Sequence, residues 1–152
     1  MTEKMDEVDI KIMRILQEDS RVSLDDMSSK LHISKSTVHY RVKKLVSSGV
    51  IKGFSAIIDP EKVGKEILCA TLVKAKYKPD YSPKMGHELS AIRGVWAVYF
   101  LLGEYDFLIL SRAENQKDLK RIIEEIISLE IVEKSSTQVV LNTIKEDIRV
   151  EL

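Results

Sequence analysis

The spacing of apolar residues changes once along this 152-residue chain, and the change divides it into two parts. Before Asp59–Pro60, apolar residues recur at the spacing of helices that bury one face. After that dipeptide, β-rich segments are interleaved with two helical ones. We therefore expect a helical domain at residues 1–59, a hinge at 60–66 and an α+β domain at 67–152.

Three helix starts in the first part are marked by capping residues. Asp6, Ser23 and Ser34 each precede a helical segment, and the first two have an aspartate three residues later, as in a capping box. Few residues separate the second and third predicted helices, which is typical of a helix-turn-helix. Gly49 is suited to end the third helix, and residues 50–58 are expected to be an extended, strand-like segment.

The third predicted helix has an outer face suited to DNA. Its apolar positions share one side, whereas the other side carries hydroxyls, an aromatic ring and cations. No Asp or Glu occurs from Met27 to Ile58. Short polar groups can reach base edges in the major groove, and cations hold phosphates. The candidate DNA-binding residues are Ser34, Lys35, Ser36, Thr37, His39, Tyr40, Arg41, Lys43 and Lys44. The alternative is a plain solvated surface helix, although such helices usually mix Glu with Lys.

Composition limits the other classes of function. Lys plus Arg and Asp plus Glu both number 24, so only the uneven distribution of charge favours a nucleic-acid partner. The longest apolar run, Val95–Leu102, is far shorter than the roughly 18–20 residues of a membrane span. The N-terminus lacks the apolar segment of a secretory signal, and the single Cys69 excludes an intrachain disulfide and a multi-cysteine zinc site. We expect a cytoplasmic protein with no metal, no cofactor and no membrane partner.

The second part has the element order βαββαβ. This order predicts a ferredoxin-like domain, an antiparallel sheet with both helices on one face. The strands are expected at 67–77, 95–102 (as a buried strand), 107–110 and 135–144, and the helices around Met85–Ile92 and after Asn115. The helix-free face of such a sheet is usually covered by a partner, so self-association is predicted.

Short motifs recur in a specific order over nearly the whole chain. In the first part they are Asp6-x-x-Asp9, Ile15–Leu16, Asp19–Ser20–Arg21, Ser34-x-x-Thr37–Val38-x-x-Arg41–Val42-x-x-Leu45, Gly49–Val50–Ile51 and Asp59–Pro60. In the second part they are Gly94–Val95, Gly103-x-x-Asp106 and Ser136–Thr137. In order and spacing the chain resembles the Lrp/AsnC, or feast/famine, family of transcriptional regulators.

That resemblance implies a winged-helix-like DNA-binding domain and a C-terminal ligand-sensing domain. It also implies homodimers that assemble further into tetramers or octamers and bind double-stranded DNA at paired half-sites. A small effector, commonly an amino acid, would bind where dimers meet, near the Gly-x-x-Asp turn, and shift assembly or DNA affinity. The effector-binding candidates are Gly103, Glu104, Tyr105, Asp106, Ser136, Thr137 and Gln138.

Other interpretations of these residues remain open. Gly103 and Asp106 are also the residues of an ordinary tight hairpin turn. A DNA-organising protein of the same fold without effector control is a second possibility. A sirohaem-decarboxylase-like enzyme is a third, although the second part holds only one histidine, His87, and no catalytic motif is evident.

Overall fold

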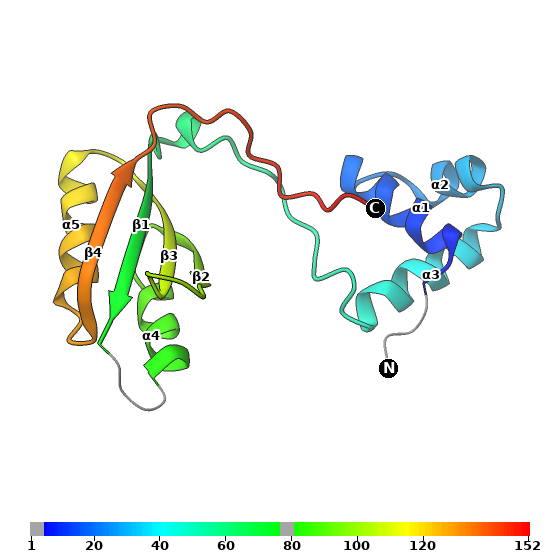
Figure 1. Cartoon of the computed structure of the whole chain (residues 1–152). Coiled ribbons are helices and arrows are strands. Elements are labelled where there is room, and N and C mark those ends of the chain that lie inside the picture. Colours follow the sequence, from blue (N-terminus) through cyan, green and yellow to red (C-terminus); the bar gives the residue numbers. More distant parts are fainter. Residues whose placement is uncertain (1–4, 77–80) are drawn as a thin grey trace. The chain divides into compact units, whose positions relative to one another are not determined.

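The structure, a computed structural model, describes residues 5–76 and 81–152 and divides the chain into two compact units. Residues 1–57 together with 146–152 form a helical unit, and residues 58–145 form a sheet-containing unit (Figure 1). The sequence places residues 146–152 in the second domain, whereas the structure groups them with the helices. The physical reason is that Leu152 packs against the helical core.

The helical unit contains α1 (Glu7–Glu18), α2 (Leu24–Leu31) and α3 (Lys35–Ser47). All three predicted caps are confirmed, because the side chains of Asp6, Ser23 and Ser34 accept backbone N–H groups in the first turn of each helix. The apolar faces meet in a small core. Its buried residues are Ile12, Met13 and Leu45. Val38 is fully buried as well.

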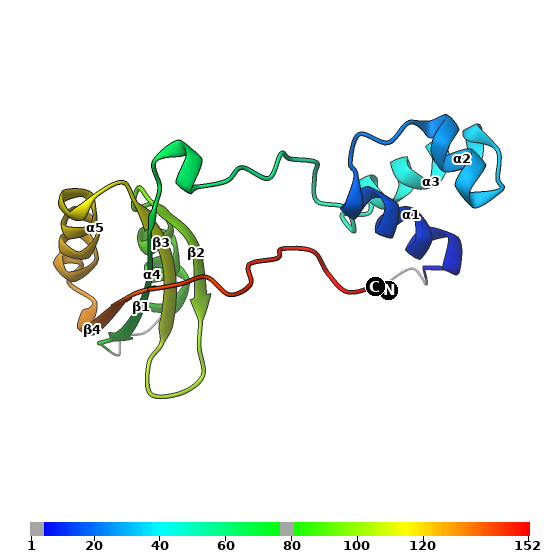
Figure 2. The ribbon, with the colours of Figure 1, turned by 90° about the horizontal axis from the view of Figure 1, so that it is seen from above.

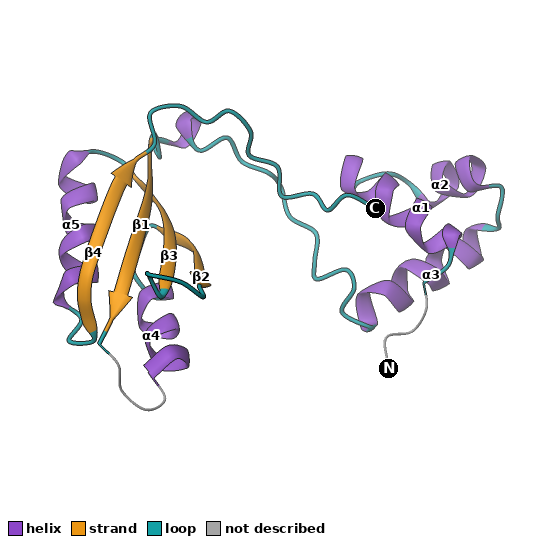
Figure 3. Ribbon diagram, viewed as in Figure 1, coloured by secondary structure: helices purple, strands orange, loops and turns teal. Residues whose placement is uncertain are grey.

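Residues 50–58 do not form the strand-like segment predicted from their β-rich composition. They run as a loop, drawn in teal in Figure 3, and no strand of the described chain pairs with them. A strand needs a neighbour for its backbone hydrogen bonds, and this segment has none among residues 5–76 and 81–152. Phe54, Ile57 and Ile58 are therefore left more than half exposed.

The second unit has the predicted βαββαβ order. The 3₁₀ turn Glu61–Val63 precedes the sheet, whose four antiparallel strands have the order β2-β3-β1-β4 of a ferredoxin-like domain. Its elements are β1 (Ile67–Ala75), α4 (Tyr81–Ser90), β2 (Val95–Phe100), β3 (Phe107–Ala113), α5 (Gln116–Ser128) and β4 (Val132–Val139).

The strand boundaries differ from those expected. The first strand ends at Ala75, and Tyr77, its expected last residue, lies outside the described residues. The third strand is longer than predicted, because it pairs with β1 as far as Ala113. The last strand lies at 132–139 rather than 135–144, because β1 offers partners only from Cys69 to Ala75.

One face of the sheet carries both helices. Alternate residues of β1 and β3, among them Val73, Phe107 and Ile109, pack with Met85 of α4 and Ile122 of α5 in one buried cluster. Cys69 lies on the same face with 1% of its surface exposed, and burial raises the pKa of its thiol. The expectation of two helices on one face is confirmed.

No helix of residues 5–76 and 81–152 covers the other face of the sheet. Its central residues include Leu72 and Leu108, which are paired across β1 and β3 and only half buried. The strand predicted at Val95–Leu102 is found at Val95–Phe100, but the prediction that it is buried is wrong. Because β2 is at the edge of the sheet with one neighbour, Trp96 and Tyr99 are 45% and 51% exposed.

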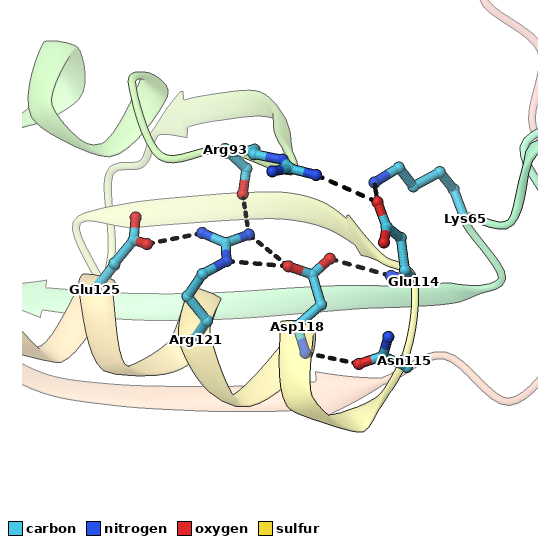
Figure 4. A network of polar contacts seen from close by, with 7 residues as sticks. All are labelled: Lys65, Arg93, Glu114, Asn115, Asp118, Arg121 and Glu125. Carbon is cyan, nitrogen blue, oxygen red and sulfur yellow. Dashed lines mark hydrogen bonds and ion pairs between the residues drawn. The ribbon is translucent and has the colours of Figure 1, made fainter.

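A network of charged side chains fixes the start of α5 (Figure 4). Arg121 donates to Asp118 and Glu125, at 2.7 Å each, and to the carbonyl of Arg93 at 2.8 Å. Glu114 in turn binds Lys65 at 2.6 Å. Lys65 holds the pKa of Glu114 below its ordinary value, and Arg121 with the N–H of Glu114 does the same for Asp118.

The turn that this network holds contains Gly94. Its φ is +97°, which L residues rarely adopt, and a Cβ there would lie 2.8 Å from both the Arg112 carbonyl and Ile122 Cδ1. Glycine is required at this position for backbone conformation and for space.

Candidate DNA-binding face and effector turn

The third helix is attached to α1 by its apolar side and by one ion-paired arginine. Val38 is fully buried and Leu45 nearly so. Arg41 Nη1 lies 2.7 Å from Asp6 Oδ2 and 2.8 Å from Asp9 Oδ1. The N–H of Asp9 and the guanidinium of Arg41 hold the pKa of Asp6 below its ordinary value. Arg41, a predicted DNA contact, is therefore placed to fix the orientation of α3 on α1.

Hydroxyl groups gather at the first turn of α3. Ser34 Oγ accepts the N–H of Thr37 at 3.2 Å and lies 2.7 Å from Thr37 Oγ1 and 2.9 Å from Ser36 Oγ. Ser34 is thus used as the N-cap, and Ser36 lies at the exposed edge of the cluster.

The outward side of α3 is cationic and aromatic. Tyr40 is 67% exposed, and His39 and Lys43 are exposed beside it. Lys35 forms an exposed ion pair of 2.8 Å with Asp25 of α2, whereas Lys44 is half buried. Exposed ion pairs of this kind are weak, so the Lys35 ammonium can leave the Asp25 carboxylate and bind a phosphate instead.

The turn between α2 and α3 depends on a residue that the sequence analysis did not single out. His32 has φ 54° and ψ 41°, and it is the only non-glycine with positive φ among the described residues. Its N–H and that of Ile33 both bind the carbonyl of Ser28, whose hydroxyl binds the Ile33 carbonyl. The one sequence signal for this turn is the residue type, since histidine is enriched at positions with positive φ.

The predicted effector turn joins β2 to β3 and protrudes beyond the strands in Figure 2. Asp106 is the half-buried end of this turn. Its carboxylate accepts the N–H of Ala75 at 2.7 Å, and its own N–H donates to Val73 at 2.9 Å. Asp106 therefore closes the end of β1, where the β1–β4 pairing is irregular.

Gly103 and Glu104 lie at the exposed tip of the turn. Gly103 does not have positive φ, and an added Cβ would meet nothing within 4 Å. Within the single chain, neither backbone conformation nor space requires glycine here. The open space beside it can admit a ligand or a second chain.

The candidates on β4 are divided between the two faces of the sheet. Thr137 Oγ1 lies 2.9 Å from Oγ1 of the buried Thr71, on the helix-covered face. Ser136 and Gln138 alternate with Thr137 and so belong to the uncovered face. Because β1 separates β4 from β3, these residues and the turn do not meet across neighbouring strands. The ammonium of Lys134 lies over the Tyr105 ring, 5.9 Å from its centre.

Two family models match the chain. A winged helix-turn-helix DNA-binding model covers residues 5–52, and the Lrp/AsnC ligand binding domain covers residues 69–150. The chain belongs to the Lrp/AsnC family. The resemblance stated from its motifs is confirmed.

Relatives of this Lrp/AsnC protein match it over nearly the whole chain. The HTH-type transcriptional regulator FL11 of Pyrococcus horikoshii is 39% identical over 142 residues, 93% of each chain. An uncharacterized HTH-type transcriptional regulator of Pyrococcus abyssi is 35% identical and covers 97% of this chain and 99% of its own. A Neisseria meningitidis regulator in complex with L-Met has a TM-score of 0.90 at 23% identity, covers 97% of each chain and shows the same fold.

As an Lrp/AsnC protein, the chain is a transcriptional regulator with a DNA-binding and a ligand-binding domain, and its named relatives are regulators rather than enzymes. Among the described residues, no group of three or more His, Cys, Asp or Glu side chains is arranged to hold a metal ion. No helix in the described part of the chain is long and apolar enough to cross a membrane.

Proposed function

We propose that this Lrp/AsnC regulator reads specific DNA sequences through α3. The observation that carries the proposal is the exposed, carboxylate-free side of α3 with Ser36, His39, Tyr40 and Lys43. Small polar and aromatic groups near the middle of such a helix contact base edges, and lysines contact phosphates. Arg41 supports this face by holding α3 on α1 through its ion pair with Asp9.

We propose that an amino acid binds the sheet-containing unit and controls DNA binding or assembly. The L-Met complex of the Neisseria regulator supports an amino acid as the ligand class. Exposed amides and the open space at Gly103 suit a ligand carboxylate. Ser136 and Gln138 supply polar groups on the uncovered face. Asp106, already bonded to Ala75, serves to shape the turn.

We propose that the protein acts as a cytoplasmic homodimer that assembles further into tetramers or octamers. The support is the uncovered sheet face, where the exposed Tyr99 is paired with Leu108, which in turn is paired with Leu72. Apolar patches of this kind usually mark interfaces. A two-fold dimer would present two copies of α3 to paired half-sites.

Selection of DNA from a random pool tests sequence reading. The wild-type protein is expected to enrich a repeated half-site, and Tyr40→Ala to enrich it less. Lys11→Ala, which removes an exposed cation from α1, is the matched control. Binding of all sequences with equal affinity would replace this proposal with a general DNA-organising role.

A thermal-shift screen against the twenty amino acids, run with sizing chromatography, tests the effector. A ligand at about 100 times its dissociation constant stabilises the protein by about 2.7 kcal/mol, which raises Tm measurably. A Tm increase with a change in assembly supports the proposal. If no amino acid raises Tm, amino acids are excluded as the effector.

A further inference from the structure

The last residues of the chain form part of the helical unit. Gln17 Nε2 donates to the carbonyl of Val150 at 2.9 Å, and the N–H of Val150 donates back to Gln17 Oε1 at 2.7 Å. Arg14, one helical turn earlier, donates from Nε to the Leu152 carbonyl at 2.9 Å. One face of α1 thus holds the backbone of the tail, residues 146–152.

These contacts recognise an extended backbone rather than particular side chains. The paired bonds of Gln17 and Val150 copy the two bonds that one strand residue makes with its neighbour. Leu152 adds a side-chain contact, because it packs against the cluster of Ile12, Met13 and Leu45. Ile148 and Val150 stay 70% and 66% exposed, so the tail is held by few contacts.

An apolar groove of about 630 Å³ borders the docked tail. It is lined by residues of α1, by the loop 50–57 and by the tail itself, including Leu16, Phe54 and Val150, and by no residue of α3. The tail therefore lines one side of the helical unit together with α1 and the loop 50–57, and α3 does not contribute to that side.

We propose that the tail is a releasable strap that braces the DNA-binding unit. When docked it holds α1, whose Asp9 binds Arg41 and thereby fixes α3; when released it lowers DNA affinity. A segment held by few contacts belongs to the low-stability parts of a protein, where switching elements are found. The DNA-affinity part of this inference rests on the proposed function.

The strap also gives the sheet-containing unit a second covalent route to the helices. The tail continues the chain from β4, whereas residues 48–66 join α3 to β1. The chain therefore connects β4 to the tail on α1 through residues 140–145 without passing through α3.

Amide hydrogen exchange of the full-length protein tests docking without DNA. Gln17→Ala and a chain ending at Asp147 are both expected to exchange α1 amides about tenfold faster, since loss of one or two net hydrogen bonds is of that order. Exchange in β1 and β3 stays unchanged. Glu151→Ala, at an exposed tail position, is the matched control. Unchanged exchange of α1 in both variants would overturn the proposal.

DNA affinity is then measured on the same proteins. The two variants are expected to bind about fivefold more weakly than Glu151→Ala, and the peptide Glu146–Leu152 added to the shortened chain is expected to restore both exchange protection and affinity. Faster amide exchange with unchanged DNA affinity would show that the tail stabilises α1 but does not control DNA binding, which would overturn the proposal. If the wild type binds no DNA, the proposed function fails, and the exchange result still decides whether the tail docks.

Discussion

Arg41 Nη1 lies 2.8 Å from Asp9 Oδ1, so α3 and α1 share an ion pair whose aspartate side chain is only 10% exposed. We expect Arg41→Ala to lower the free energy of unfolding of the helical unit by about 2 kcal/mol, because a half-satisfied carboxylate remains in a buried position. Lys35→Ala removes an exposed pair and is expected to change stability by less than about 0.5 kcal/mol. Denaturation followed by circular dichroism measures both; equal losses would contradict this assignment.

Lys43 is expected to bind phosphate. Lys43→Ala should weaken binding to every DNA sequence and reduce the salt dependence, with the log–log slope changing by about 0.9 for one lost phosphate contact. Tyr40→Ala should instead reduce discrimination between sequences. Titrations at several salt concentrations, with Lys11→Ala as the control, measure both effects. An unchanged slope for Lys43→Ala would place the phosphate contacts elsewhere.

Asp106 should have a structural effect that precedes any effect on ligand binding. Asp106→Ala leaves the N–H of Ala75 without its acceptor and is expected to lower the stability of the sheet-containing unit by about 1–2 kcal/mol. Asp106→Asn keeps an acceptor oxygen and loses the charge, so it should be more stable than Asp106→Ala. Thermal unfolding of the two variants tests this order. An alanine variant as stable as the wild type would show that the bond to Ala75 is dispensable.

Gly94 and Gly86 should respond in opposite directions to alanine. Gly94→Ala places a methyl group 2.8 Å from a carbonyl and from Ile122 at φ +97°, so a loss of about 2–4 kcal/mol is expected. Gly86→Ala, inside α4 and no closer than 3.9 Å to Phe107, should gain about 0.5–1 kcal/mol. Urea midpoints give both values. A tolerated Gly94→Ala would mean that the turn relaxes.

The stability of the sheet-containing unit at acidic pH should depend on Glu114 and Asp118. Their pKa values are lowered in the folded protein from ordinary values of 4.5 and 3.8. A carboxyl group whose pKa is lower in the folded than in the unfolded protein stabilises the fold at pH values above its unfolded pKa. This stabilisation is lost as the pH falls through the folded pKa. The sheet-containing unit should therefore lose stability below about pH 4.5, and less steeply in Glu114→Gln/Asp118→Asn. Denaturation from pH 7 to pH 3 checks this; identical slopes would contradict it.

The sequence predicted the elements that are determined by residues close together in the chain. The caps at Asp6, Ser23, Ser34 and Asn115 and the helical spacing that follows each depend on residues within one or two turns. The order βαββαβ then allows few topologies, and the ferredoxin-like one is found.

Features that depend on distant partners were not predicted. Residues 50–58 have strand composition but no neighbouring strand, and β2 is exposed because of its place at the edge. Arg41 resembles its neighbours on α3 in type, and its bond to Asp9, 32 positions away, leaves no local signal in the sequence. The docking of Val150 on Gln17 spans 133 positions and leaves no local signal. The roles of the DNA-contact and effector residues stay predictions.

The buried Cys69 makes the protein convenient to label. Its thiol is 1% exposed and has a raised pKa, so the reactive thiolate is scarce at neutral pH and out of reach of a bulky maleimide. A second cysteine placed at an exposed position such as Ser47, at the end of α3, would carry a single fluorophore in an otherwise native chain. A change in its fluorescence when DNA is added would then test whether α3 lies at the DNA interface.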